Sequence, residues 1–127
     1  MKTSELGGFA AMRCENKDEI QIVSVSGEVD LYSARRLGEV IWRAKSQADV
    51  DPPRVVVDLR EVEFMDTAGL EVLMEEWNSS RQLDGRMYLV AQEGPITRLL
   101  EVSGLGELFD LYAELDAAVG ACALAPV

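Results

Sequence analysis

Apolar and polar positions along this chain switch from the period of a strand to the period of a helix and back. Near the N-terminus, FAAMRCE and IQIVSVSGEV carry alternating or β-branched residues and flank the polar stretch NKDE. This pattern is typical of two strands joined in a hairpin. The sequence GEVD, residues 27–30, then predicts that the second strand ends in a loop.

A helix is predicted over residues 31–48. Its apolar residues follow the i, i+3, i+4, i+7 spacing of one helix face, while charged residues take the other side. Asp30 or Ser33 is suited to cap the start of this helix. Pro52 and Pro53 prevent its continuation. The predicted buried face comprises Leu37, Val40, Ile41 and Ala44.

The remainder of the chain alternates strands with helices. RVVVDLREV contains the continuous β-branched run Val55, Val56 and Val57, which is of the kind found in a strand covered on both faces. A helix from about Thr67 to Leu83 follows, and RMYLVA, GPITRLLEVSG, LFDLYA and ELDAAVGACALA then predict strand, helix, strand and helix. Strands that alternate with helices imply a mostly parallel sheet with right-handed crossovers.

The predicted fold class is therefore α/β, in a single domain. We expect a mixed, mostly parallel β-sheet with an N-terminal antiparallel hairpin, packed against about four helices. The domain spans residues 9–127, and residues 1–8 form a loose lead-in.

The stretch FMDTAGLEV, residues 64–72, places an aspartate and a hydroxyl where a predicted strand meets a predicted helix. Asp66 suits the N-cap position, because its carboxylate can accept hydrogen bonds from backbone N–H groups one turn on. Its negative charge also suits the positive end of the helix. Thr67 is then the first helical residue, and we expect its side chain to stand at the loop edge, where the cap does not use it.

The helix that begins at Thr67 has two predicted faces. The core face comprises Leu70, Leu73, Met74 and Trp77, and the opposite face carries Ala68, Val72, Glu75 and Ser79, with Glu71 and Glu76 beside it. Val72 is an apolar residue on this polar face, next to small residues that let another protein approach closely. An isolated exposed apolar residue is also ordinary, so both interpretations stay open on this ground alone.

Composition narrows the function classes. The chain has 127 residues, a formal net charge of −11, no histidine and two cysteines. Without histidine, a Cys/His zinc site and a Ser-His-Asp triad are excluded. The acidity disfavours nucleic acid and anionic membranes, and it either attracts a protein partner with a basic face or only keeps the domain soluble. No signal segment and no nucleotide-binding glycine motif is evident, so we expect a cytoplasmic protein with free thiols and no cofactor.

One enzymatic alternative rests on Asp58, which follows the buried run VVV. Aspartyl phosphotransfer domains keep a nucleophile at such a position, with further carboxylates for Mg²⁺ and a basic residue for the phosphate. Haloacid-dehalogenase-like phosphatases have a second aspartate two residues later, where this chain has Arg60. Receiver domains need an acidic pair, which Glu28 and Asp30 could supply, but no partner lysine follows a later strand. This alternative is the less favoured one.

Three segments together resemble the STAS domain of anti-sigma factor antagonists. They are GEVD after an early strand, then RVVVDLREVEFMDTAGL, then GRMYLVAQEGPITRLLEVSGLGELFDLY. In that family the corresponding patterns are G-E-[LV]-D, F-M-D-[ST]-x-G-L and P-x-x-R-L-x-x-x-S-G-L, in this order. The resemblance runs from about residue 9 to 120, and it implies a small α/β domain with a mixed sheet, like the one predicted above.

The resemblance also implies a mechanism. The hydroxyl residue after the FMD-type aspartate, here Thr67, is phosphorylated by a partner anti-sigma factor that is a GHKL-type serine kinase. The unphosphorylated antagonist binds that partner and frees a sigma factor, and a PP2C-type phosphatase resets the switch. Asp30, Asp66 and Gly69 match the positions that support the switch. The residues assigned to partner binding are Glu28, Ala68, Glu71, Val72 and Glu75.

Three further expectations come with the family. The domain is not itself an enzyme, it binds neither nucleic acid nor membrane, and it is a monomer when free. The common pattern has serine at the switch, often followed by serine or threonine, whereas this chain has Thr67 followed by Ala68. That departure leaves room for a stressosome-like protein, or for a STAS scaffold that binds a partner without being phosphorylated.

Overall fold

The computed structural model describes residues 10–48 and 50–124, so the lead-in predicted for residues 1–8 lies outside the described residues. The elements follow the predicted order. They are β1 (Ala10–Lys17), β2 (Ile20–Val29), α1 (Leu31–Ser46), β3 (Arg54–Met65), α2 (Thr67–Gln82), β4 (Arg86–Val90), α3 (Pro95–Ser103), β5 (Asp110–Tyr112) and α4 (Leu115–Leu124).

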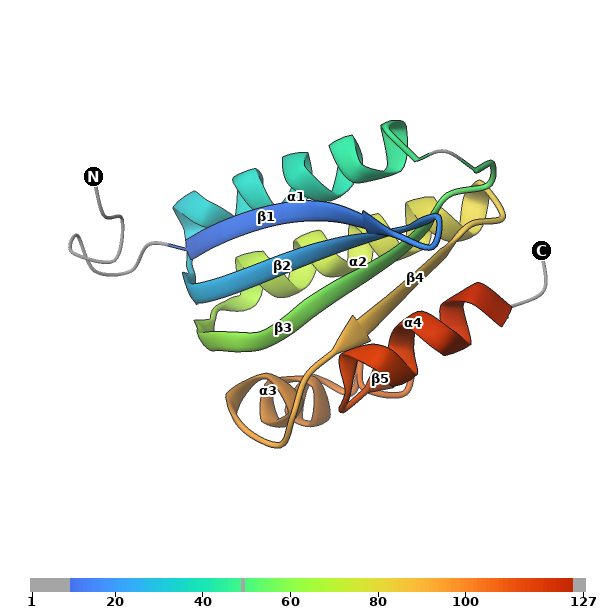
Figure 1. Cartoon of the computed structure of the whole chain (residues 1–127). Helices are drawn as coiled ribbons and strands as arrows, with labels where there is room; N and C mark the ends of the chain where they lie inside the picture. The colour runs from blue at the N-terminus through green and yellow to red at the C-terminus, as the bar shows by residue number, and fades with distance from the viewer. Residues whose placement is uncertain (1–9, 49, 125–127) are drawn as a thin grey trace.

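The strands form one five-stranded sheet in the order β1-β2-β3-β4-β5 (Figure 1). β1 pairs with β2 in antiparallel orientation, and every later pair is parallel. The hairpin turns through Asp18 and Glu19, whose φ angles are 54° and 70°. Two positive φ angles give a turn whose twist matches that of the flanking strands. The predicted α/β class and the antiparallel N-terminal hairpin are thus confirmed.

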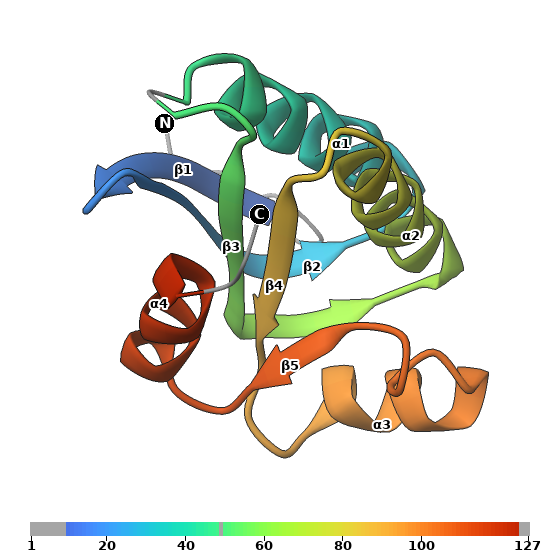
Figure 2. The same cartoon turned by 90° about the vertical axis from the view of Figure 1, so that its right-hand side faces the viewer.

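Helices cover the two faces of the sheet unequally (Figure 2). α1, α2 and α3 pack on one face, where the larger of two apolar clusters includes Leu37, Leu73 and Leu100. α4 alone packs on the other face, against a cluster that contains Ile22, Val56 and Tyr88 together with its own Cys122. Burial raises the pKa of the Cys122 thiol to about 11, so this cysteine acts as a packing residue.

The ends of β2 and β3 correct one prediction. GEVD does not form a loop, because β2 continues to Val29 and Asp30 directly caps α1. The extension is possible because β3 also runs on, so that Glu28 lies opposite Phe64 and Val29 opposite Met65. Irregularities in the ladder between Ser24 and Ser26 and between Gly27 and Glu28 accommodate the longer pairing. Both strands therefore end side by side.

The α2 helix also differs from its predicted faces. Leu70 and Leu73 are buried as expected, and Trp77 is half-buried with its ring edge-on to Phe109, 6.0 Å between centroids. Met74, predicted to be core, is 36% exposed. Val72, predicted to face solvent, is half-buried and packs against the core cluster.

The packing of α2 on α1 explains this rotation. At Gly38 of α1, an added Cβ would lie 3.3 Å from Val72 Cγ1, so the missing side chain makes room for Val72. Further along, Lys45 Nζ donates to both the backbone oxygen and the Oε1 of Glu76, each at 2.8 Å. The buried face of α2 is therefore turned toward α1. The spacing of apolar residues within α2 does not show where this neighbouring helix lies.

Candidate functional site

The starts of α1 and α2 lie next to each other at one edge of the sheet. Because β2 and β3 are parallel neighbours that end in register, the helices that follow them begin at the same edge. The backbone N–H of Asp66 donates to the carbonyl of Val29 at 3.1 Å, which ties the two strand-to-helix junctions together. We call this region, residues 28–33 and 64–69, the helix-start rim.

Asp30 closes the start of α1. Its Oδ1 accepts from the backbone N–H groups of Tyr32 and Ser33, both at 3.0 Å, and the N–H of Asp30 donates to Ser33 Oγ at 2.9 Å. The pKa of the Asp30 carboxyl lies below its ordinary value, mainly because of the hydrogen bond from the Ser33 N–H. Hydrogen bonds from the Ser33 hydroxyl and the Tyr32 N–H lower it further. Asp30 is therefore ionised at neutral pH, and its oxygen is engaged in a reciprocal cap.

Asp66 caps α2 as the sequence predicted. Its Oδ1 accepts from Ala68 N–H at 2.9 Å and from Gly69 N–H at 3.4 Å. Thr67 is the first residue of the helix and is exposed. Among the residues that the structure describes, its hydroxyl has no hydrogen-bond partner. The cap thus leaves the Thr67 oxygen available to other molecules.

Gly69 sets how closely α2 approaches the strand ends. A Cβ at this position would lie 2.7 Å from Met65 Cγ and 2.9 Å from Val29 Cγ1, distances that real Cβ atoms do not tolerate. The first turn of α2 therefore rests directly on β2 and β3. Gly69 has a packing role, and that packing fixes where Thr67 stands.

The rim also carries apolar side chains that the sequence reasoning missed. Leu31 is 68% exposed, Tyr32 88% and Phe64 48%. The sequence pattern could have indicated their exposure. Leu31 and Tyr32 precede the buried stripe of α1, and Phe64 precedes buried Met65 in a strand with alternating faces. Exposed apolar side chains on the same two junctions as an exposed hydroxyl mark a surface suited to a protein partner.

The residues predicted to bind a partner divide into two groups. Glu28, Glu71 and Glu75 are exposed, and Glu28 lies opposite Phe64 in the ladder. Ala68 and Val72 are half-buried. The structure thus brings Glu28 and Ala68 to the rim, whereas Val72 and Glu75 lie further along α2, in the groove between α2 and α1.

Asp58 is placed in the middle of β3, where it is buried and pairs with Arg60. Arg60 Nε donates to Oδ1 at 3.0 Å, and Arg60 NH2 donates to Oδ2 at 2.9 Å. That carboxylate is the main cause of the raised pKa of Arg60. No group of three or more acidic or cysteine side chains among the described residues could hold a metal ion. The surroundings of Asp58 are those of a fixed ion pair, which gives the phosphotransfer alternative no support.

The part of the chain spanning 10–48 and 50–124 contains no helix long and apolar enough to cross a membrane.

Comparison with known proteins identifies the class that this fold and site define. Residues 11–118 match the STAS domain, so the chain belongs to the STAS domain family. Over 92 residues it is 30% identical to an anti-sigma-B factor antagonist of Staphylococcus aureus (strain NCTC 8325 / PS 47), covering 72% of this chain and 82% of that protein. Over 106 residues it is 29% identical to an anti-sigma-B factor antagonist of Bacillus subtilis (strain 168), covering 83% of this chain and 92% of that protein.

A solved structure agrees with these relatives. The crystal structure of an anti-sigma factor antagonist from Mycobacterium paratuberculosis superposes with a TM-score of 0.81 and 31% sequence identity, covering 91% of this chain and 96% of that one. Within the STAS family, the chain is therefore similar to anti-sigma factor antagonists over most of its length.

Proposed function

We propose that this protein is an anti-sigma factor antagonist whose helix-start rim binds an anti-sigma factor of the GHKL-type serine kinase class and thereby frees a sigma factor. The observation that carries the proposal is Thr67, an exposed hydroxyl at the first position of α2 that makes no hydrogen bond with the described residues. The similarity of this chain to anti-sigma-B factor antagonists supports the same function.

The rim has the composition of a protein interface. Tyr32 and Phe64 are exposed aromatic side chains, and Leu31 adds an exposed aliphatic one. Aromatic side chains often dominate binding energy when a partner covers them. Around them, Glu28 and Glu63 are exposed carboxylates. A partner with a basic face would be attracted over long range by these groups and by the net charge of −11.

Phosphorylation of Thr67 would switch this interface off. The kinase partner supplies ATP, Mg²⁺ and the catalytic base. Thr67 Oγ1 bonds to the γ-phosphorus, the bond from that phosphorus to the bridging oxygen breaks, ADP leaves, and the hydroxyl proton passes to the partner's base. In this scheme the chain is a substrate and no enzyme, and Asp30 and Asp66 hold the helix starts that present the hydroxyl. A PP2C-type phosphatase restores the unmodified state.

The added phosphate acts through charge. It carries about −1.5 to −2 charges at neutral pH, and a helix N-terminus accommodates such an anion without refolding. A bound partner, however, would have to desolvate it beside Asp30, Asp66 and Glu63. A loss of about 3–4 kcal/mol at the interface weakens binding by roughly two to three orders of magnitude.

Threonine at the switch position keeps the nucleophilic oxygen and adds a methyl group. The methyl lies on an exposed residue, so the fold accommodates it without cost. Its effect falls on the kinase, whose active site must accept a branched substrate. We expect phosphorylation by a kinase matched to threonine and slower transfer from one matched to serine.

The experiment is to incubate the chain with candidate GHKL-type kinases and ATP and to map the modified residue by mass spectrometry. Phosphate is expected on Thr67, and none on Thr67→Ala. Ser46→Ala is a matched control, because Ser46 is an exposed hydroxyl at the other end of α1, and it should be phosphorylated on Thr67 like the wild type.

Binding of the same kinase then tests the switch. Thr67→Glu and the stoichiometrically phosphorylated protein should bind at least about a hundredfold more weakly than the unmodified chain. Unchanged affinity of the phosphorylated protein would rule out the proposed switch. A kinase homologue that binds the rim tightly but never modifies Thr67 would instead identify the chain as an unphosphorylated scaffold.

A further inference from the structure

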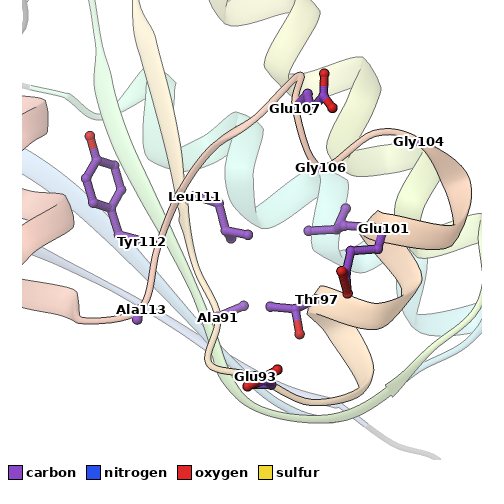
Figure 3. A pocket seen from close by; sticks show the side chains of 11 residues that line it. Ala91, Glu93, Thr97, Glu101, Gly104, Gly106, Glu107, Leu111, Tyr112 and Ala113 are labelled. Atoms are coloured by element: carbon purple, nitrogen blue, oxygen red, sulfur yellow. The ribbon is translucent and has the colours of Figure 1, made fainter.

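The molecule also has a groove that shares no lining residue with the helix-start rim. It is a groove of about 740 Å³ between α3, the turn that follows α3, and the ends of β4 and β5 (Figure 3). The proposed switch uses none of the residues that line it.

The floor of this groove is apolar and largely buried. Ala91 is 4% exposed and Leu100 1%, and Leu111 is half-buried against the same core cluster. Thr97 stands beside them, and its hydroxyl is already engaged, because Oγ1 accepts from Gly94 N–H at 2.9 Å and donates to the Gly94 carbonyl at 3.0 Å. The floor therefore offers apolar contact to a ligand and little hydrogen bonding.

One wall of the groove is nearly bare backbone. Gly104 ends α3 in the left-handed conformation, with φ of 78°, and no atom lies within 4 Å of where its Cβ would be. The N–H groups of Leu105 and Gly106 both donate to the carbonyl of Leu100 at 3.1 Å, which fixes the turn. With glycines at 104 and 106, an extended peptide can approach this wall closely.

The edge of the groove is acidic on three sides. Figure 3 shows Glu93 below, Glu101 on α3 to the right, and Glu107 above the apolar floor. All three are exposed, and none forms an ion pair with another described residue. Glu76, by contrast, pairs with Lys45 at 2.8 Å, so the three edge carboxylates differ from it in remaining open to a cationic ligand.

We infer that this groove docks a basic segment of a partner protein, one in which arginine or lysine residues alternate with aliphatic residues. The aliphatic side chains and the methylene stems of the basic ones would lie on the apolar floor. The cationic groups would reach Glu93, Glu101 and Glu107 in charge-assisted hydrogen bonds. The acidic edge repels phosphate-bearing ligands, so the occupant is a basic peptide and neither a nucleic acid nor an anionic lipid.

The test uses the full chain and a defined probe, the capped peptide Ac-Gly-Leu-Arg-Leu-Arg-Gly-NH₂, followed by ¹⁵N–¹H NMR. Amide shifts are expected at Glu101, Gly104, Gly106 and Leu111. A peptide with citrulline in place of each arginine, which keeps the shape and removes the charge, should bind about tenfold more weakly, because each exposed ion pair contributes only a few-fold. No anti-sigma factor is needed, so the result is independent of the switch.

Paired variants locate the effect. Glu101→Gln with Glu107→Gln should weaken arginine-peptide binding about tenfold, since two ion pairs are lost. The matched control, Glu15→Gln with Glu39→Gln, makes the same charge change on exposed positions of β1 and α1 and should leave binding within about twofold. The inference would be overturned if the control pair weakened peptide binding as much as the groove pair, or if the citrulline peptide bound as tightly as the arginine peptide. It would also be overturned if arginine amide alone bound as tightly as the peptide, because that result indicates a small-cation site.

Discussion

The two helix starts at the rim use the same cap and differ in what they do with a hydroxyl. Asp30 and Asp66 each accept from two backbone N–H groups of the first turn. At α1 the hydroxyl belongs to Ser33, three residues after the cap, and it accepts from the Asp30 N–H at 2.9 Å. At α2 the third position is Gly69, and the hydroxyl belongs to Thr67, directly after the cap.

This difference shows that position within the first turn decides whether a hydroxyl is available. A side chain three residues after the cap reaches back to the cap residue, and the two residues hydrogen-bond to each other. A side chain one residue after the cap points away from that pair. α1 is therefore closed at its start, whereas α2 leaves one oxygen free, next to the aspartate that begins the helix.

The largest expected effect concerns the third position of α2. Gly69→Val should lower the free energy of unfolding by about 2–3 kcal/mol, because a Cβ there collides with Met65 and Val29. The measurement is urea-induced unfolding followed by circular dichroism. A loss of this size would show that the open start of α2 depends on close contact with the strands.

Gly120→Ala provides the control for that substitution. Gly120 lies inside α4, and nothing is found within 4 Å of its added Cβ. Alanine there should raise the free energy of unfolding by up to about 1 kcal/mol, since it reduces the entropy lost on helix formation. If Gly69→Val were as stable as the wild type, the close contact described here would be wrong.

A smaller effect compares the two hydroxyls directly. Ser33→Ala breaks the reciprocal cap and should lower the free energy of unfolding by about 0.5–1 kcal/mol. Thr67→Ala removes a hydroxyl with no partner among the described residues and should change it by less than about 0.5 kcal/mol. Thermal and urea unfolding of both variants check this. Equal losses would contradict the distinction between a consumed and a free hydroxyl.

The smallest effect is a pH dependence at Asp30. Its pKa is lower in the folded protein than in the unfolded chain, where an aspartate titrates near about 3.9. The stability it contributes is therefore complete above that value and is lost as the pH falls through the lower, folded pKa. Asn caps a helix well without charge, so Asp30→Asn isolates this contribution.

The urea midpoints of wild type and Asp30→Asn should differ at neutral pH and converge in acid. Glu101→Gln, which removes one exposed carboxylate elsewhere, corrects for the change in net charge. A gap between wild type and Asp30→Asn that stayed the same from neutral pH until the carboxylates are protonated would mean that Asp30 acts through something other than its ionised cap.

Much of the fold was predictable from local patterns. The order of the nine elements, the cap at Asp66 and the stop at Gly104 follow from residue periods and from side chains that bond within one turn of themselves. The exposure of Met74 and the burial of Val72 were not predictable, because they depend on which side of α2 its neighbour occupies. That the apolar side chains of Leu31, Tyr32 and Phe64 belong to one surface was also not predictable, because they come from two separate junctions of the chain.

The sequence by itself determined that Asp66 begins a helix and that Thr67 follows it, since capping involves atoms three residues apart at most. Only the tertiary structure decided that the junctions carrying Asp30 and Thr67 lie next to each other, with exposed apolar side chains on both. That arrangement requires β2 and β3 to end in register and Gly69 to let α2 rest on them. Contacts between residues far apart in the chain depend on how whole elements pack, which a local pattern does not specify.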